Sequence, residues 1–122
     1  MNRRNFILMA TGALAGPVPG SAFAQGYPSR PIRIVVPYPP GGPLDLAARL
    51  VGAHMATQFA APVVVENKPG AGGDIGVQLV ASAPADGYTL LLSGPNITIS
   101  PLLLNSTARF NPIESFDHLS RL

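Results

Sequence analysis

Two stretches of the sequence decide the fold: IVVPYPPGG at residues 34–42 and VVVENKPGAGG at residues 63–73. In each stretch a short run of β-branched residues ends in a turn rich in proline or glycine, and an amphipathic segment follows. A strand, a glycine turn and a helix in succession leave backbone N–H groups free at the helix N-terminus, where the helix dipole favours an anion. The two turns together predict a carboxylate or phosphate site.

The rest of the chain continues the alternation of strands and helices. We expect strands at residues 32–37, 63–65 and 88–92, and the first two are too continuously apolar to have a solvated face. Such strands are typical of a parallel sheet that is covered on both sides. Ligands bind at the carboxyl ends of the strands in open sheets of this kind, so the turns after the three strands should converge on one site.

Helices are expected between the strands. Pro43 and Asp45 mark the start of the first, because proline is tolerated at the first helical position and a carboxylate suits the N-terminal dipole. A second helix at residues 75–83 should turn Ile75, Leu79 and Val80 toward the sheet, and a short third helix is expected at residues 97–104. The buried face of the first helix is predicted from i, i+3, i+4 spacing at Ala47, Leu50, Val51, His54, Met55, Gln58 and Phe59.

Residues 1–24 have the features of an export signal. Arg3 and Arg4 supply a positive charge, residues 6–15 are apolar but too short to span a bilayer, and AFA at residues 22–24 is a small-x-small cleavage site. We therefore expect cleavage after Ala24, with a disordered or amphipathic N-terminus as the alternative. The run RRNFI at residues 3–7 also resembles a twin-arginine export signal.

Composition excludes several classes of function. Residues 1–24 hold two of the eight Lys and Arg side chains and none of the six Asp and Glu side chains, so residues 25–122 have a formal charge of zero. The basic character belongs to the signal and gives no support for a nucleic-acid partner. The absence of cysteine excludes disulfides, thiol catalysis and a Cys-ligated metal, and His54 and His118 lack a metal-ligand spacing.

Catalytic and nucleotide-binding motifs are also missing. No serine lies in a Gly-x-Ser-x-Gly elbow, no Gly-Lys-Ser/Thr phosphate loop occurs, and the glycines at residues 70–76 miss the dinucleotide fingerprint by one residue. We therefore predict no catalytic residue, no cofactor and no metal. An exported α/β enzyme fragment, such as a hydrolase or transferase, and a non-functional truncated product remain as alternatives.

Five motifs together resemble one family. They are YPSRPIR at residues 27–33, VPYPPGG at 36–42 with Asp45, PVVVENKPGAGG at 62–73, ADGYTLL at 85–91 and FNPI at 110–113. In this order they resemble the Bug family, the periplasmic solute-binding receptors of tripartite tricarboxylate transporters. The resemblance implies a small carboxylate ligand, the membrane subunits of such a transporter as partners, a periplasmic location and no enzymatic activity.

The same resemblance implies the fold class: an α/β, two-lobed, type II periplasmic-binding-protein architecture. Residues 25–122 would form the N-terminal part of the first lobe, a parallel sheet that starts βαβαβ. On this interpretation the chain is truncated near the crossover to the second lobe, which is missing. A one-sided site should bind carboxylates in the millimolar range or not at all.

The resemblance also implies which residues hold the ligand carboxylate, mostly through backbone groups. Leu44 departs from the family, which usually has a small polar residue there. The ordinary alternatives are that Gly41 and Gly42 only permit a tight turn, that Asp45 only complements the helix dipole and that Tyr38 is a core-edge aromatic. The implied residues are Tyr38, Pro39, Pro40, Gly41, Gly42 and Asp45 in the first turn, Gly70, Ala71, Gly72 and Gly73 in the second, and Ser93 and Asn96 in the third.

Overall fold

The computed structural model describes residues 26–103 and 110–119. The predicted signal peptide and its cleavage site lie outside the described residues. The elements follow the predicted order, with a three-residue 3₁₀ turn added: β1 (Ile32–Val36), α1 (Pro43–Phe59), β2 (Val63–Asn67), η1 (Ala71–Gly73), α2 (Asp74–Ala81), β3 (Thr89–Leu91) and α3 (Asn96–Leu103).

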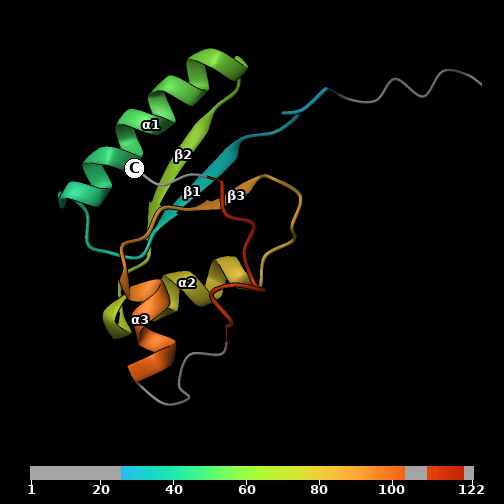
Figure 1. The fold of residues 1–122 in the computed structure, drawn as a ribbon. Coiled ribbons are helices and arrows are strands. Elements are labelled where there is room, and N and C mark those ends of the chain that lie inside the picture. Colours follow the sequence, from blue (N-terminus) through green and yellow to red (C-terminus); the bar gives the residue numbers. More distant parts are fainter. Residues whose placement is uncertain (1–25, 104–109, 120–122) are drawn as a thin grey trace, which may run out of the picture.

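The three strands form one parallel sheet in the order β2-β1-β3. The chain moves from β1 to β2 on one side and then crosses back to β3 on the other, so β1 is central. Parallel crossovers are almost always right-handed, and reversing the direction of travel places successive helices on opposite faces. Figure 1 shows this arrangement, with α1 on one side of the strands and α2 on the other.

The core lies along β1. Ile34 pairs with Val65 of β2 and with Leu90 of β3, and this row packs under α1 together with buried Ala48. On the opposite face Val35 is fully buried, as is Val77 of α2. The prediction that β1 is covered on both faces is therefore confirmed.

The same prediction is wrong for β2. Val64 is 52% exposed, because the strand order leaves β2 at the edge of the sheet, beyond the reach of α2. On this face Glu66 pairs with Arg33 and with Lys68, at 3.3 and 2.8 Å. Charged side chains on an edge strand discourage pairing with another sheet.

The predicted buried face of α1 is wrong by about one position. Leu50 is 74% exposed, whereas Ala48 and Gly52 are buried against the sheet. A Cβ atom on Gly52 would lie 3.4 Å from Val63 Cγ1, so the helix approaches the strands closely through its small residues. Hydrophobic spacing selects large side chains and therefore missed this face. Met55, which packs against the core cluster, was predicted correctly.

Helix α2 shows the same one-residue error. Ile75 is 54% exposed, and the buried positions are Gly76 and Val77. A Cβ atom on Gly76 would lie 2.8 Å from both Pro37 Cβ and the Lys68 carbonyl oxygen. Only glycine permits this distance between α2 and the ends of β1 and β2.

At the amino end of the sheet, the motif at residues 27–33 is hydrogen-bonded to the motif at residues 85–91. Tyr27 Oη donates to the Gly87 carbonyl at 2.7 Å, and the Ser29 N–H donates to Tyr88 Oη at 2.7 Å. The Arg30 guanidinium also lies over the Tyr88 ring, 4.3 Å from its centroid. These motifs stabilise the amino end and leave the carboxyl ends of the strands to the three turns.

Candidate functional site

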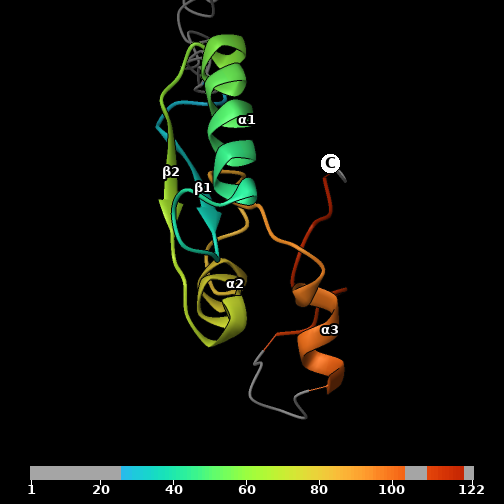
Figure 2. The same ribbon diagram turned by 90° about the vertical axis from the view of Figure 1, so that its left-hand side faces the viewer.

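The three predicted turns follow the carboxyl ends of the three strands. Residues 37–42 lead from β1 into α1, residues 68–73 lead from β2 into α2, and residues 92–95 lead from β3 toward α3. Figure 2 shows α1 and α2 starting from this end of the sheet. Because strand order reverses at β1, the carboxyl ends of β1 and β3 form the kind of switch point at which α/β sheets bind ligands.

The Asp45 carboxylate accepts hydrogen bonds from three residues at the first turn, and its side chain is only 3% exposed. Its Oδ2 accepts the Gly41 N–H at 2.9 Å and Arg49 Nε at 3.0 Å, and its Oδ1 accepts Asn67 Nδ2 at 3.0 Å. The Arg49 hydrogen bond, followed by that from Gly41, lowers the pKa of Asp45 to about 2. The carboxylate is therefore ionised at physiological pH, and protein donors occupy both of its oxygens.

The start of α1 leaves two backbone donors available. Gly42 is the N-cap, with φ −79° and ψ 170°, and no side chain caps this end in the described structure. The first intrahelical bond runs from the Leu46 N–H to the Gly42 carbonyl at 3.0 Å. Pro43 has no N–H, so the N–H groups of Leu44 and Asp45 remain without an intrahelical acceptor.

A cavity of about 330 Å³ lies at this helix start. It brings together five of the six predicted first-turn residues, and Leu44 and Pro43 complete the lining. Gly41 is not part of the lining, and its N–H is bound to Asp45. Tyr38 both lines the cavity and packs against the core, so it combines its two predicted alternatives. The lining residues are Tyr38, Pro39, Pro40, Gly42, Pro43, Leu44 and Asp45.

The second turn has an unusual backbone. Gly70, Ala71, Gly72 and Gly73 all have positive φ, from 49° at Ala71 to 136° at Gly70. The Gly73 N–H donates to the Gly70 carbonyl at 2.9 Å, and the Asp74 N–H donates to the Ala71 carbonyl. One donor of this turn and the first N–H of α2 are therefore bound to carbonyls of the turn. None of its four residues lines either of the two cavities described here.

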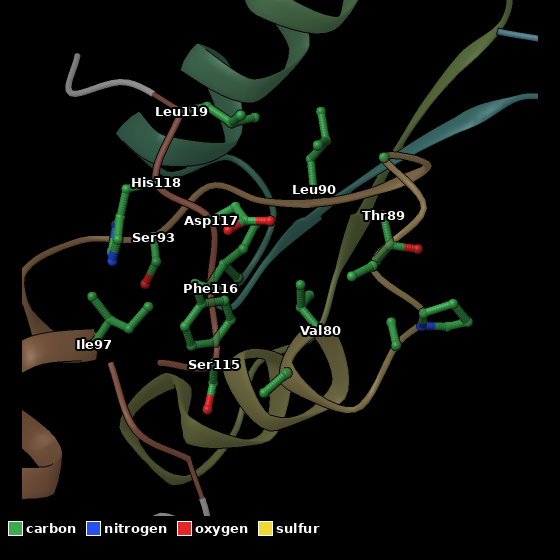
Figure 3. A pocket seen from close by; sticks show the side chains of 16 residues that line it. Val80, Thr89, Leu90, Ser93, Ile97, Ser115, Phe116, Asp117, His118 and Leu119 are labelled. Carbon is green, nitrogen blue, oxygen red and sulfur yellow. The ribbon is translucent and has the colours of Figure 1, made fainter. Parts of the chain in front are cut away.

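The third turn borders a separate cavity of about 400 Å³ between α2, β3 and residues 115–119. In Figure 3, Ser93, Ile97 and His118 lie on the same side of it. No residue lines both cavities, so the structure does not join Ser93 to the first turn in one pocket. Asn96 is the first residue of α3.

Among residues 26–103 and 110–119, no three potential metal ligands come together, and no helix there has the length and apolar character needed to cross a membrane.

Sequence reasoning missed two members of the first-turn network, Asn67 and Arg49. Asn67 Nδ2 donates to the Tyr38 carbonyl at 3.1 Å as well as to Asp45. Alternation along β2 places Asn67 on the same face as Val63 and Val65, toward α1, and this was a usable signal. The i, i+4 spacing of Asp45 and Arg49 was another.

These features define an α/β lobe with helix N-termini gathered at the carboxyl edge of a parallel sheet, the edge at which sheets of this kind bind ligands. Residues 47–122 match the family described as the tripartite tricarboxylate transporter family receptor, TctC. The match covers more than half of the chain, so the chain belongs to this family. The expected resemblance is thereby confirmed, and the description of the family is that of a receptor.

Individual relatives agree. The chain is 45% identical over 94 residues to protein BugT of Bordetella pertussis, covering 77% of this chain and 28% of BugT. A solved structure described as a periplasmic transporter has 44% identity and a TM-score of 0.65, over 71% of this chain and 29% of that one. MatC from Rhodopseudomonas palustris with bound malate has 35% identity and a TM-score of 0.62, over 74% of this chain and 31% of MatC. The chain thus corresponds to part of a periplasmic-binding-protein lobe and spans under a third of these relatives.

Proposed function

We propose that this chain forms the carboxylate-gripping part of a periplasmic receptor, and that the N–H groups of Leu44 and Asp45 hold the ligand. The observation that supports this most directly is an uncapped helix N-terminus whose first residues line a cavity. The glycine turn at residues 70–73 and the third-turn residues Ser93 and Asn96 lie outside the first-turn cavity and would contact a part of the ligand that extends beyond it.

The chemistry of the first turn suits a carboxylate. The N-terminus of α1 carries a partial positive charge, and two N–H groups match two carboxylate oxygens. Tyr38, Pro39 and Pro40 surround these donors with apolar surface, which lowers the local dielectric and strengthens each hydrogen bond. Arg49 offsets the negative charge of Asp45, which would otherwise repel the ligand.

The expected affinity of this part alone is modest. Hydrogen bonds to a charged group contribute about 1.5–3 kcal/mol each, and association costs consume much of that sum. A net of about 4 kcal/mol corresponds to a millimolar dissociation constant. Tighter binding would need contacts from the remainder of a longer receptor.

Export and transport complete the proposal. The signal at residues 1–24 would direct the chain to the periplasm, with cleavage after Ala24, and the loaded receptor would pass its ligand to the membrane subunits of a tripartite tricarboxylate transporter. The family and its periplasmic relatives support this assignment. MatC was solved with malate and a second R. palustris protein with adipate, so dicarboxylates are suitable probes.

The test uses the chain purified from the periplasm and labelled with ¹⁵N. Titration with malate or adipate should shift the amide signals of Leu44 and Asp45 and saturate in the millimolar range, whereas uncharged dimethyl adipate should not. Amide signals at the start of α1 that stay unchanged up to high ligand concentration would contradict the assignment. N-terminal sequencing of the same sample should begin at Gln25, and an intact Met1 would exclude the proposed export signal.

A further inference from the structure

Asn67 links the end of β2 to the first turn. It is the last residue of β2 and pairs in register with Val36, the last residue of β1. Its side-chain amide donates to the Tyr38 carbonyl at 3.1 Å and to Asp45 Oδ1 at 3.0 Å. Both acceptors belong to the β1–α1 connection and its first helical turn, so one side chain from another strand holds this segment at two points.

The backbone that carries this amide is itself fixed. The Lys68 N–H donates to the Val36 carbonyl at 2.8 Å, directly after Asn67. The end of β2 is therefore held to β1 as well as to the first turn. Asn67 also lies only three residues before Gly70, so the same anchor sets where the second turn begins.

Asp45 depends on this amide because its own position is demanding. Its carboxylate is almost fully buried, and of its three donors only Asn67 serves Oδ1. Without that donor, Oδ1 would be a buried, ionised acceptor with no partner, which is costly. The carboxylate would then be drawn toward other donors, and the N–H groups of Leu44 and Asp45, in the same helical turn, are the ones left without an intrahelical acceptor.

We infer that Asn67 is a positioning residue of the carboxylate site: it holds Asp45 in the orientation that fixes Gly41 and leaves the N–H groups of Leu44 and Asp45 to the ligand. This inference rests on the proposed function for its ligand but not for its geometry. Asn67 itself does not line the first-turn cavity, so it acts through Asp45 and the turn rather than by contact.

The test replaces the donor with a group whose donor capacity depends on pH. In Asn67→Asp, a carboxylate faces Asp45 and the Tyr38 carbonyl, both acceptors, and the like charge raises the pKa of the introduced acid. The other ionisable groups nearby are the Tyr38 hydroxyl, Arg49, which is bound to Asp45, and Lys68, whose Nζ is paired with Glu66. On protonation the introduced acid regains an O–H donor.

The matched control is Val64→Asp. It adds the same charge to the same strand at an exposed position that faces away from the first turn. Asn67→Leu, similar in size and without a donor at any pH, shows the effect of losing the hydrogen bonds alone. Each chain is ¹⁵N-labelled and titrated with adipate at pH 8 and pH 5, and the Gly41 amide signal is followed without ligand.

Adipate itself begins to take up protons near pH 5, so each variant is compared with the parent at the same pH, and Val64→Asp should bind adipate as the parent does at both pH values. Asn67→Asp should bind at least about tenfold more weakly at pH 8, the scale of one charge-assisted hydrogen bond, and should recover at pH 5. Its Gly41 signal should shift and recover in parallel, and Asn67→Leu should lose affinity at both pH values. A residue that only stabilised the fold would lower the melting temperature of folded variants without changing affinity or Gly41.

Either of two results overturns the inference: an unchanged Gly41 signal in folded Asn67→Leu, or a pH-independent loss in Asn67→Asp. If Asn67→Asp does not fold at pH 8, Asn67→Leu and the pH 5 data decide. If the Leu44 amide signal of the parent chain does not change when adipate is added, the proposed function is contradicted instead. The Gly41 measurement without ligand would still test the role of Asn67.

Discussion

Replacing Gly42 with aspartate should stabilise the protein and abolish carboxylate binding at the same time. Gly42 is the N-cap of α1, and its extended backbone is the conformation in which Asp, Ser or Asn accept N–H groups of the first helical turn. A Cβ atom there would meet only the Pro39 carbonyl oxygen, at an ordinary 3.8 Å. The new carboxylate would therefore occupy the N–H groups of Leu44 and Asp45 without disturbing the turn.

The stability gain follows from two contributions. A good N-cap is worth a few tenths of a kcal/mol over glycine, and a negative charge at a helix N-terminus about 0.3–1 kcal/mol. Together they predict a gain of about 0.5–1 kcal/mol, or about 2–8 °C in melting temperature for a domain of this size. Affinity for adipate should fall below detection, because the ligand would meet occupied donors and a like charge.

The assay pairs urea unfolding with the adipate titration. Gly26→Asp is the control, since it adds the same charge at a position with no neighbour within 4 Å of a Cβ atom. Gly42→Ser repeats the cap with a neutral hydroxyl, which separates occupied donors from charge repulsion. A Gly42→Asp protein that is more stable and still binds adipate like the parent would refute the assignment of these N–H groups to the ligand.

Five other substitutions, in three tests, examine the packing and the electrostatics. Gly76→Ala should destabilise the fold by about 1–3 kcal/mol in urea unfolding, because α2 cannot move away from the backbone beneath it, whereas Gly72→Ala, with no atom nearby but a φ of 68°, should cost about 1 kcal/mol. Gly52→Leu should lower the free energy of unfolding by about 1–3 kcal/mol, and Leu50→Ala should lower it by no more than about 0.5 kcal/mol. The reverse order would mean that α1 buries the face expected from hydrophobic periodicity and not the face that contains Gly52. The pKa of Asp45 is lowered from 3.8 to about 2, so its stabilising contribution is complete above pH 3.8 and is lost as the pH falls toward 2. Asp45→Asn should remove this part of the acid dependence, and an unaltered acid transition would contradict the hydrogen-bonded geometry.

The order and type of the elements could be predicted because each element is specified by residues that are neighbours in the sequence. The β-branched runs at residues 34–36 and 63–65 specify strands, and the proline and glycine turns after them specify where helices begin. The helix faces could not be predicted in the same way, because α1 and α2 contact the sheet through Gly52 and Gly76. Close packing needs small side chains there, and hydrophobic periodicity does not register a glycine.

In the site, too, contacts between sequence neighbours could be predicted and contacts between distant residues could not. The first-turn residues adjoin one another in sequence, so their meeting at one cavity was predictable. The contacts of Asn67 reach 29 residues back to Tyr38 and 22 back to Asp45, and they exist only because β2 lies beside β1. The exposure of Val64 has the same origin, since strand order is a property of the whole sheet. Pairwise contacts of this kind require the topology before they can be derived.

The position of Asp45 raises a problem that the network resolves. An acidic residue in the first turn of a helix normally stabilises that helix by facing its N–H groups. In a site that must receive an anion, the same residue would compete with the ligand for those donors. Here Gly41, Arg49 and Asn67 draw the carboxylate away from them, so its charge is satisfied within the protein while the donors stay available. Under the proposed function, the helix gives up the stability of a cap, a trade-off expected where function needs an unsatisfied group.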